Sequence, residues 1–395
     1  MAAIFLVHEG EKGVRPVLFM AVTHRVLTLF GHPFAMPVVR NSPSSRLRKR
    51  VMVAGFVSLA FVAIVCGVIL LKSGHGSPAE IAQAADAVVV PETPVSVAAV
   101  APSPPKMTDY ASPDQPTAVG VMTMTFTDLT RSTPARGDRE ALSTRPLTVT
   151  VRYPTPGMPG EDEIPNAPAY EPAPLVLFAH GFDVSSDRYA SLLHELAADG
   201  FVVAAPEFPM SSTVFDGAAD EYDIPDQARD LSFLITAMTS PDAPTQLAEM
   251  IAPGPVGVIG HSDGAVTALL AAYAPRYTDS RIAAVVAVSG DFDTFGGEWF
   301  STNDPPLLAI HGEYDEINPF ESSQLLVGND PGPAMLVGVQ GQSHLGSVTD
   351  SQVVPVVAQL VANNFRWRLN GLPDAEAATI ATASTPPLQL VASHD

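Results

Sequence analysis

From residue 118 onward, the pattern of hydrophobic and polar positions predicts strands that alternate with helices. Two segments, 119–127 and 147–153, alternate apolar with polar residues, as half-buried strands do. Continuously apolar runs come next, as expected for parallel strands covered on both faces, at 175–179, 201–205, 256–259, 282–288, 307–310 and 335–339. Stretches with helical periodicity lie between or after these runs, at 187–198, 226–238, 264–274, 319–326 and 351–367. The alternation predicts an α/β fold for residues 118–370, a three-layer sandwich whose mostly parallel sheet is preceded by two antiparallel strands.

The residues outside this globular part divide into segments of different composition. Residues 51–71 form an uncharged apolar run, and at ~1.5 Å per helical residue the run spans roughly the 30 Å core of a bilayer. Basic residues are concentrated just before it, which predicts a transmembrane anchor with residues 1–50 in the cytoplasm and the later chain outside. A cleaved signal sequence, which would release a secreted protein, is the alternative interpretation. Residues 72–117, rich in proline and alanine, predict an extended linker, and the weakly patterned residues 371–395 predict a flexible tail.

The charge of the chain is strongly divided along its length. Residues 1–72 hold 9 basic and 2 acidic residues, whereas the remainder holds 12 basic and 40 acidic residues. A nucleic-acid partner is therefore not expected, because phosphate binding needs clustered Lys and Arg. Lys106 is the only lysine after Lys72, which excludes a Schiff-base lysine or a phosphate-loop lysine from the globular part. The single cysteine, Cys66, excludes disulfides within the chain, and no residue set suggests a metal or an organic cofactor.

The strongest chemical signal follows the apolar run 256–259, where Gly260-His261-Ser262-Asp263-Gly264 precedes a helical pattern. A G-x-S-x-G sequence between a strand and a helix is typical of a nucleophile elbow, in which a strained turn projects the serine hydroxyl into a cleft. Glycine is needed two positions before and after the serine, because side chains there would collide with neighbouring backbone. Ser262 is therefore the candidate nucleophile.

A serine hydroxyl needs a base that takes its proton and an acid that orients this base. In proteins with such an elbow these residues follow later strands in the order Ser, Asp, His. Asp315 lies in the loop after 307–310 and is the candidate acid, and His344 lies in the loop after 335–339 and is the candidate base. The alternative acids are Asp291, Asp293, Glu313 and Glu316, of which the two glutamates are expected to face solvent.

An oxyanion hole requires two backbone N–H groups aimed at the developing negative charge. One is expected from Asp263, the residue after the nucleophile, and the other from Phe182 in the loop that follows 175–179. Around this centre, the acidic segment 209–226 is a candidate rim or lid. The candidates for an apolar pocket are Phe292, Phe295, Trp299 and Phe300.

These motifs resemble the α/β-hydrolase superfamily, and within it the group of platelet-activating-factor acetylhydrolases, chlorophyllase-like proteins and cutinase-like polyester hydrolases. The resemblance covers 118–367 and rests on GHSDG at 260–264, LVLFAHGF at 175–182, TVTVRYP at 148–154, EYDEINP at 313–319 and GQSH at 341–344. The polyester hydrolases have matching segments for the acid and the base, which implies these roles for Asp315 and His344. Two differences argue against an aromatic polyester as substrate. Asp263 stands where Met or Phe is usual, and residues 289–295 lack the tryptophan that clamps aromatic rings.

The sequence and the resemblance together predict a serine hydrolase that cleaves carboxylic esters through an acyl-enzyme on Ser262. An acidic rim disfavours anionic acyl groups, so neutral esters with short to medium acyl chains are expected. Acyl transfer to an alcohol, or cleavage of amides or peptides, by the same three residues is the alternative. A non-catalytic binding domain on a stalk is a third hypothesis. The expected partners are a small-molecule or lipid-like ester and, through residues 51–71, a membrane.

Overall fold

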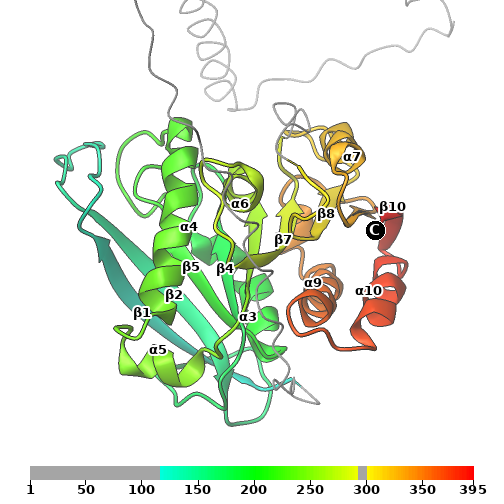
Figure 1. Ribbon diagram of the computed structural model, residues 1–395, viewed down its shortest axis with the longest axis horizontal. Coiled ribbons are helices and arrows are strands. Elements are labelled where there is room, and N and C mark those ends of the chain that lie inside the picture. Colours follow the sequence, from blue (N-terminus) through cyan, green and yellow to red (C-terminus); the bar gives the residue numbers. More distant parts are fainter. Residues whose placement is uncertain (1–115, 292–299) are drawn as a thin grey trace, which may run out of the picture. The chain divides into compact units, whose positions relative to one another are not determined.

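The computed structural model describes residues 116–291 and 300–395, and their centre is a sheet of ten strands (Figure 1). The strand order is β10-β9-β8-β7-β6-β4-β5-β2-β1-β3. The strands are β1 (Ala118–Asp128), β2 (Arg145–Thr155), β3 (Glu163–Pro165), β4 (Leu175–Ala179), β5 (Val202–Glu207), β6 (Val256–His261), β7 (Ile282–Val288), β8 (Leu307–Gly312), β9 (Ala334–Val339) and β10 (Leu388–His394). Pairing is parallel from β5 through β4, β6, β7 and β8 to β9. It is antiparallel between β1 and β2 and between β2 and β5, so the mostly parallel sheet with two antiparallel first strands is confirmed.

Helices cover both faces of the sheet, and each face has its own apolar core. The helices are η1 (Ser186–Tyr189), α3 (Ala190–Ala198), η2 (Glu221–Asp223), α4 (Ile224–Thr239), α5 (Thr245–Met250), α6 (Asp263–Tyr273), α7 (Phe320–Asn329), α8 (Gly346–Thr349), α9 (Val354–Arg368) and α10 (Ala375–Ala383). Leu177 and Val258 face the core that contains α4, α5, α6 and α7. Phe178 and Ile259, their neighbours along the strands, face the core that contains α3, α8, α9 and α10. The predicted three-layer sandwich is confirmed, and the continuous apolar runs follow from burial on both faces.

The prediction of a flexible tail at residues 371–395 is wrong. This segment forms α10, which packs on α9, and β10, which pairs antiparallel with β9. Thr379 and Ala383 of α10 are fully buried, and Leu388 of β10 is 2 % exposed. Small alanine and threonine side chains let α10 approach α9 closely, so the helix is held without the large apolar stripe that would reveal it in the sequence.

No helix in residues 116–291 or 300–395 has both the length and the apolar character that crossing a membrane requires. The predicted cytoplasmic segment 1–50, the predicted anchor 51–71 and nearly all of the predicted linker 72–117 lie outside the described residues.

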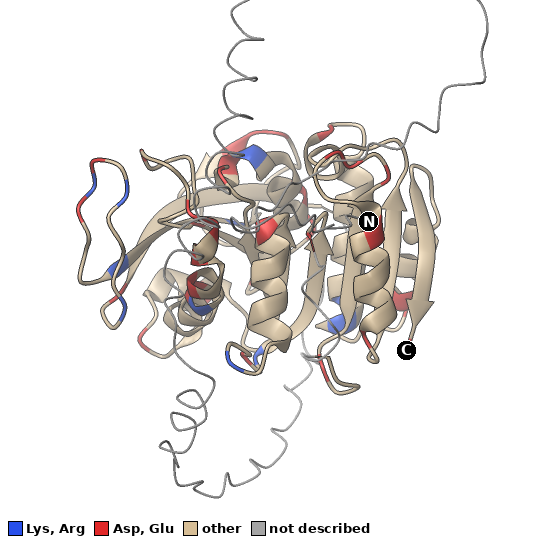
Figure 2. Ribbon diagram, turned by 90° about the horizontal axis from the view of Figure 1, so that it is seen from above, with Lys and Arg blue, Asp and Glu red and all other residues tan. Residues whose placement is uncertain are grey.

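A buried ion-pair cluster fixes the start of α4 against the sheet. Most charged residues lie in loops and near helix ends (Figure 2), whereas Arg145 at the start of β2 is fully buried. Its guanidinium contacts both carboxylate oxygens of Asp230 at 2.7–2.9 Å and Asp223 Oδ2 at 2.8 Å. Burial alone would lower the pKa of Arg145, but the two carboxylates raise it, so the cation persists. The cluster anchors the carboxyl end of the acidic segment 209–226.

Candidate active site

Ser262 lies at the turn between β6 and α6, as the sequence predicts for a nucleophile elbow. Its backbone has φ 57° and ψ −126°, a conformation that residues with side chains rarely adopt, and its N–H donates to the Val288 carbonyl at 2.9 Å. A Cβ at Gly260 would overlap the carbonyl oxygen of Gly264, and a Cβ at Gly264 would overlap that of Ala179. The close crossing of these backbones supports the strained turn and presents Ser262 at the carboxyl end of the sheet.

The structure brings the side chains of Ser262, His344 and Asp315 together. His344 Nε2 lies 3.1 Å from Ser262 Oγ, and His344 Nδ1 lies 2.8 Å from Asp315 Oδ2. A carboxylate can only accept a hydrogen bond, so Nδ1 carries the ring proton and Nε2 is left as an acceptor for the serine O–H. Asp315 follows β8 and His344 follows β9, and the side chains of both are buried. Adjacent parallel strands thus bring two distant loops to one point beside the elbow.

The Asp315 carboxylate is held by more groups than the sequence indicated. Its Oδ1 accepts the N–H groups of Ile317 at 2.9 Å and Asn318 at 2.8 Å. Its Oδ2 lies 3.2 Å from Nε2 of His311, a histidine for which the sequence suggested no role. Burial alone would raise the pKa of Asp315, but hydrogen bonds from His311, His344 and the two N–H groups hold it well below its usual range. The Asp315 carboxylate therefore stays charged. In the sequence, only the position of His311, four residues before Asp315, hints at the contact between them.

Among the alternative acids, Glu316 has a different role from the one expected. Its side chain was predicted to face solvent, and the residue is exposed, yet Oε2 accepts the backbone N–H of His344 at 3.1 Å. Glu316 therefore helps to hold the backbone of the candidate base. Glu313 is exposed, Asp291 follows β7, and Asp293 lies outside the described residues.

The loop after β4 runs beside Ser262, and His180 fixes its backbone. A Cβ at Gly181 would lie 3.1 Å from Ser262 Cβ. Burial lowers the pKa of His180 to about 4, so the ring is neutral, and its Nε2 accepts the Phe208 N–H at 3.1 Å. Its Nδ1 therefore carries the proton and donates to the Gly181 carbonyl at 2.8 Å. The Gly181 carbonyl and the Phe182 N–H share one planar peptide, so this bond also sets the direction of the Phe182 N–H.

Two residues supply the N–H groups that the sequence assigns to an oxyanion hole. Asp263 directly follows Ser262 in the chain, and Phe182 directly follows Gly181, which lies against Ser262. Asp263 is the first residue of α6, where helix N–H groups have no intrahelical acceptor. Within the described residues, the Phe182 N–H has no protein acceptor either. The Phe182 side chain is 40 % exposed, so its ring is available to a bound molecule rather than packed in the core.

The acidic segment 209–226, predicted as a rim or lid, is fixed by two arginines from the loop between β1 and β2. Arg136 is 4 % exposed, and its guanidinium donates to the carbonyl oxygens of Pro209, Ser212 and Gly217 at 2.9–3.2 Å. Arg139 also donates to Pro209 at 2.8 Å, and its guanidinium carbon lies 4.4 Å from the ring centroid of Phe215. Together with the Arg145 cluster, these contacts tie the segment to the loop between β1 and β2 and to the start of β2.

Asp263 brings a carboxyl group close to the candidate nucleophile. Burial raises its pKa to about 6, and the negative charges of Glu221 on the rim and Asp291 after β7 act in the same direction, whereas His344 lowers it. The side chain is therefore neutral in mildly acidic solution and negative in mildly basic solution. Asp263, which stands where the resembling families usually have Met or Phe, is therefore a group beside the nucleophile that changes its charge near pH 6.

The model of the alpha/beta hydrolase family matches residues 176–394, which is more than half of the chain. The chain belongs to this family. A ferulic acid esterase from Streptomyces cinnamoneus, solved at 2.4 Å resolution, is similar to it with a TM-score of 0.57 and 19% sequence identity. The similarity covers 71% of this chain and 98% of the esterase chain, and it supports the fold. No curated protein matches the sequence significantly.

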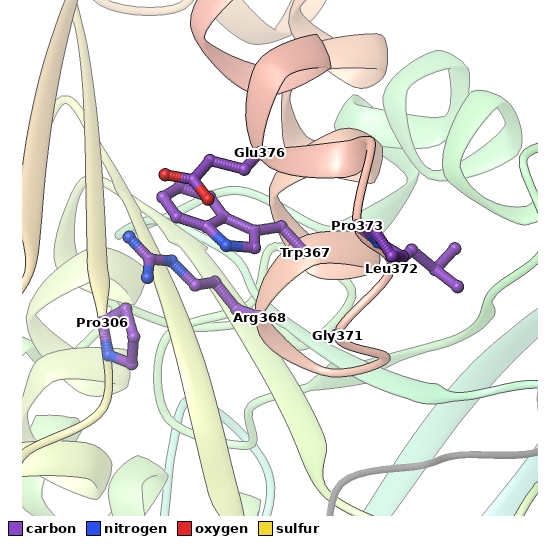
Figure 3. Close-up of a pocket in the computed structure, with 7 residues that line it drawn as sticks. All are labelled: Pro306, Trp367, Arg368, Gly371, Leu372, Pro373 and Glu376. Carbon is purple, nitrogen blue, oxygen red and sulfur yellow. The ribbon is translucent and has the colours of Figure 1, made fainter.

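In an alpha/beta hydrolase the reaction takes place at the carboxyl ends of the strands, and the cavity in Figure 3 is elsewhere. It has a volume of about 350 Å³ and is lined by Pro306, Trp367, Arg368, Gly371, Leu372, Pro373 and Glu376. Pro306 precedes β8 and therefore lies at the opposite end of the sheet from Ser262. Of the residues predicted to form an apolar pocket, Phe300 is buried against Tyr273, and the other three lie outside the described residues.

Proposed function

We propose that this alpha/beta hydrolase is a serine esterase that cleaves carboxylic esters through an acyl-enzyme on Ser262. The observation that carries the proposal is the row of hydrogen bonds from Asp315 through His344 to Ser262, with distances of 2.8 and 3.1 Å. The family to which the chain belongs supports a hydrolase, and the fold that it shares with a ferulic acid esterase is compatible with ester substrates.

The geometry gives each residue a step in the first half of the reaction. Ser262 Oγ attacks the ester carbonyl carbon while His344 Nε2 takes the hydroxyl proton, and Asp315 stabilises the resulting imidazolium. The carbonyl oxygen becomes an oxyanion, which the N–H groups of Phe182 and Asp263 stabilise. The tetrahedral intermediate then breaks its bond to the alcohol oxygen, and His344 gives its proton to the departing alcohol.

The second half repeats the same chemistry with water. His344 Nε2 takes a proton from a water molecule, whose oxygen attacks the acyl carbon bound to Ser262. The new tetrahedral intermediate expels Ser262 Oγ, which regains its proton from His344. The products are a carboxylic acid and an alcohol, and the enzyme returns to its starting state without a cofactor.

The acidic side chains near the candidate nucleophile support neutral substrates. Glu221, Asp263 and Asp291 place negative charge around the nucleophile, and such charge disfavours esters of anionic acids. The exposed residue Phe182, in the loop beside Ser262, offers apolar contact for a short or medium acyl chain. We therefore expect neutral esters with such chains to be the preferred substrates.

The proposal is tested with a series of p-nitrophenyl esters and a fluorophosphonate probe. The full chain should hydrolyse the acetate, butyrate and octanoate esters faster than the palmitate ester. The probe should add its phosphonyl group to the peptide that contains Ser262, as seen by mass spectrometry. Absence of both ester turnover and labelling would contradict the proposal, and a steep preference for palmitate would contradict the expected chain length.

The charge of Asp263 predicts a specific pH dependence. Because its pKa is raised to about 6, Asp263 is neutral below this pH and negative above it, where its charge opposes the oxyanion. Asp263→Asn removes this charge. The ratio of kcat/KM for the variant to that for the wild type should be near one below about pH 5. It should rise to about threefold to tenfold near pH 8, which corresponds to ~1 kcal/mol.

Measuring the ratio at each pH separates the effect of Asp263 from every other pH effect, because those effects are common to both proteins. Glu249→Gln is the matched control, because it removes the same formal charge from an exposed position on α5 and should leave the ratio near one at every pH. A ratio for Asp263→Asn that stays flat across this pH range would show that the Asp263 charge does not act on the reaction.

A further inference from the structure

Two buried aromatic side chains that the proposed mechanism does not use lie next to the elbow. Tyr189 ends η1, His261 ends β6, and each is 1 % exposed. Tyr189 Oη lies 3.2 Å from the Gly181 nitrogen and 3.0 Å from His261 Nδ1. His261 Nε2 lies 2.9 Å from the carbonyl oxygen of His344. The pair therefore contacts the loop of Phe182 on one side and the backbone of the base on the other.

The hydrogen atoms of this chain of contacts have one consistent arrangement. The His344 carbonyl can only accept, so His261 Nε2 carries a proton and donates it. Burial lowers the pKa of His261 to about 3, so the ring is neutral and its Nδ1 is a bare acceptor. Burial also raises the pKa of Tyr189, so its O–H is intact and donates to Nδ1, while its oxygen accepts the Gly181 N–H.

At the first end, the chain of contacts completes the support of Gly181. Its carbonyl accepts from His180, and its N–H donates to Tyr189, so both peptide units of this residue are held. Gly181 has no side chain to restrict its φ and ψ, and these two bonds take over that function. If the bond to Tyr189 is lost, a buried N–H is left without a partner, and rotation of the Gly181 backbone would turn the Phe182 N–H away.

At the second end, the same contacts complete the support of the base. The His344 N–H donates to Glu316, its carbonyl accepts from His261, and its ring nitrogens contact Asp315 and Ser262. The rings of His261 and His344 also pack against each other, with centroids 4.7 Å apart. His261 directly precedes Ser262, so one residue links the nucleophile, by the backbone, to the base, by its side chain.

We propose that Tyr189 and His261 are positioning residues that hold the oxyanion loop and the base loop at a fixed separation around Ser262. This inference rests on the proposed esterase function and deepens it. Neither side chain touches substrate in this mechanism, so their loss should affect the arrangement reached in the transition state. The effect should therefore appear in kcat and leave KM nearly unchanged.

Tyr189→Phe is the first test, because it removes one hydroxyl and keeps the ring. We expect kcat for p-nitrophenyl butyrate to fall about tenfold to a hundredfold, less than the loss of a whole oxyanion donor, while KM changes by less than about twofold. A second readout compares an ester with its thionoester, whose sulfur benefits less from the oxyanion hole. The variant should lose more activity on the ester, so the ester-to-thionoester ratio of kcat/KM should fall severalfold.

Two substitutions of His261 divide the chain of contacts in half. His261→Gln keeps a donor near the His344 carbonyl and loses the acceptor for Tyr189. His261→Asn keeps an acceptor near Tyr189 and loses the donor to His344. Each substitution should lower kcat. Tyr189→Phe should lower kcat by a smaller factor in the His261→Gln background than in the wild type, because the hydrogen bond between Tyr189 and His261 is already lost there.

Tyr153→Phe is the matched control. Tyr153 is fully buried in β2, and its hydroxyl donates to the Ala167 carbonyl at 2.7 Å, away from Ser262. The variant should lose thermal stability to a similar degree as Tyr189→Phe and keep the wild-type kcat and ester-to-thionoester ratio.

The outcomes separate this inference from the proposed function. Suppose that the wild type hydrolyses esters. The positioning role is then wrong, and the esterase function stands, under any of three results for Tyr189→Phe: kcat is unchanged, kcat/KM falls equally for the ester and the thionoester, or kcat falls by the same factor in the His261→Gln background as in the wild type. If the wild type neither hydrolyses an ester nor reacts with the fluorophosphonate, the proposed function fails and this inference fails with it.

Discussion

Ser262→Ala should lower kcat for ester hydrolysis on the order of 10⁶-fold, because the reaction then has no nucleophile that His344 can activate. The Ser262 hydroxyl lies 3.1 Å from His344 Nε2, and alanine keeps the Cβ but removes this hydroxyl. Folding should be unaffected, since alanine has the same Cβ at φ 57° and keeps the N–H bond to the Val288 carbonyl. Initial rates with p-nitrophenyl butyrate and intact-mass analysis after fluorophosphonate treatment measure the two consequences.

Ser289→Ala is a matched control for this experiment. Ser289 follows β7, the strand next to β6, and it also has a positive φ, of 49°. It is fully buried, and within the described residues its hydroxyl has no hydrogen-bond partner. The control variant should keep wild-type rates and labelling. A Ser262→Ala protein that retains a large fraction of wild-type activity would exclude Ser262 as the nucleophile.

The parts of the fold and site that the sequence predicted correctly have local signals. A parallel strand buried on both faces is a short apolar run, so the run 256–259 indicates the core of β6. The elbow needs glycine two positions before and two positions after Ser262, so five consecutive residues are enough to indicate its geometry. The order of strands then restricted the acid and base to a few loops.

The contacts that the sequence did not indicate depend on residues far apart in the chain. Tyr189 meets His261 across 72 positions, and neither belongs to a motif that requires the other. Arg136 holds carbonyl oxygens of the rim, and any residue type supplies a carbonyl, so the partners leave no trace in the sequence. Ile380, the one large apolar residue of α10, is exposed, so no apolar stripe marks this helix in the sequence. Its position depends on packing against α9, and the strand that follows it pairs with the edge of β9.

Asp315→Asn should lower kcat about 10⁴-fold, because it reverses the proton positions on His344. Asp315 Oδ1 accepts two backbone N–H groups, from Ile317 and Asn318, so the amide oxygen of asparagine should occupy this position. The amide nitrogen then replaces Oδ2, 2.8 Å from His344 Nδ1, and presents N–H groups to the ring. His344 must accept through Nδ1 and carry its proton on Nε2, where it cannot take the proton of Ser262. KM should change little, since substrate contacts are retained.

Two further substitutions make this last result specific to position 315. Glu313→Gln changes the same formal charge at an exposed residue of the same loop and should keep kcat within about twofold of the wild type, because solvent weakens the effect of an exposed charge. Asp291→Asn tests the other strand end at which the sequence allowed the acid. Retention of activity by Asp315→Asn together with its loss in Asp291→Asn would place the acid after β7. We expect the opposite, a loss of activity in Asp315→Asn and its retention in Asp291→Asn, because Asp315 contacts His344 and orients the base.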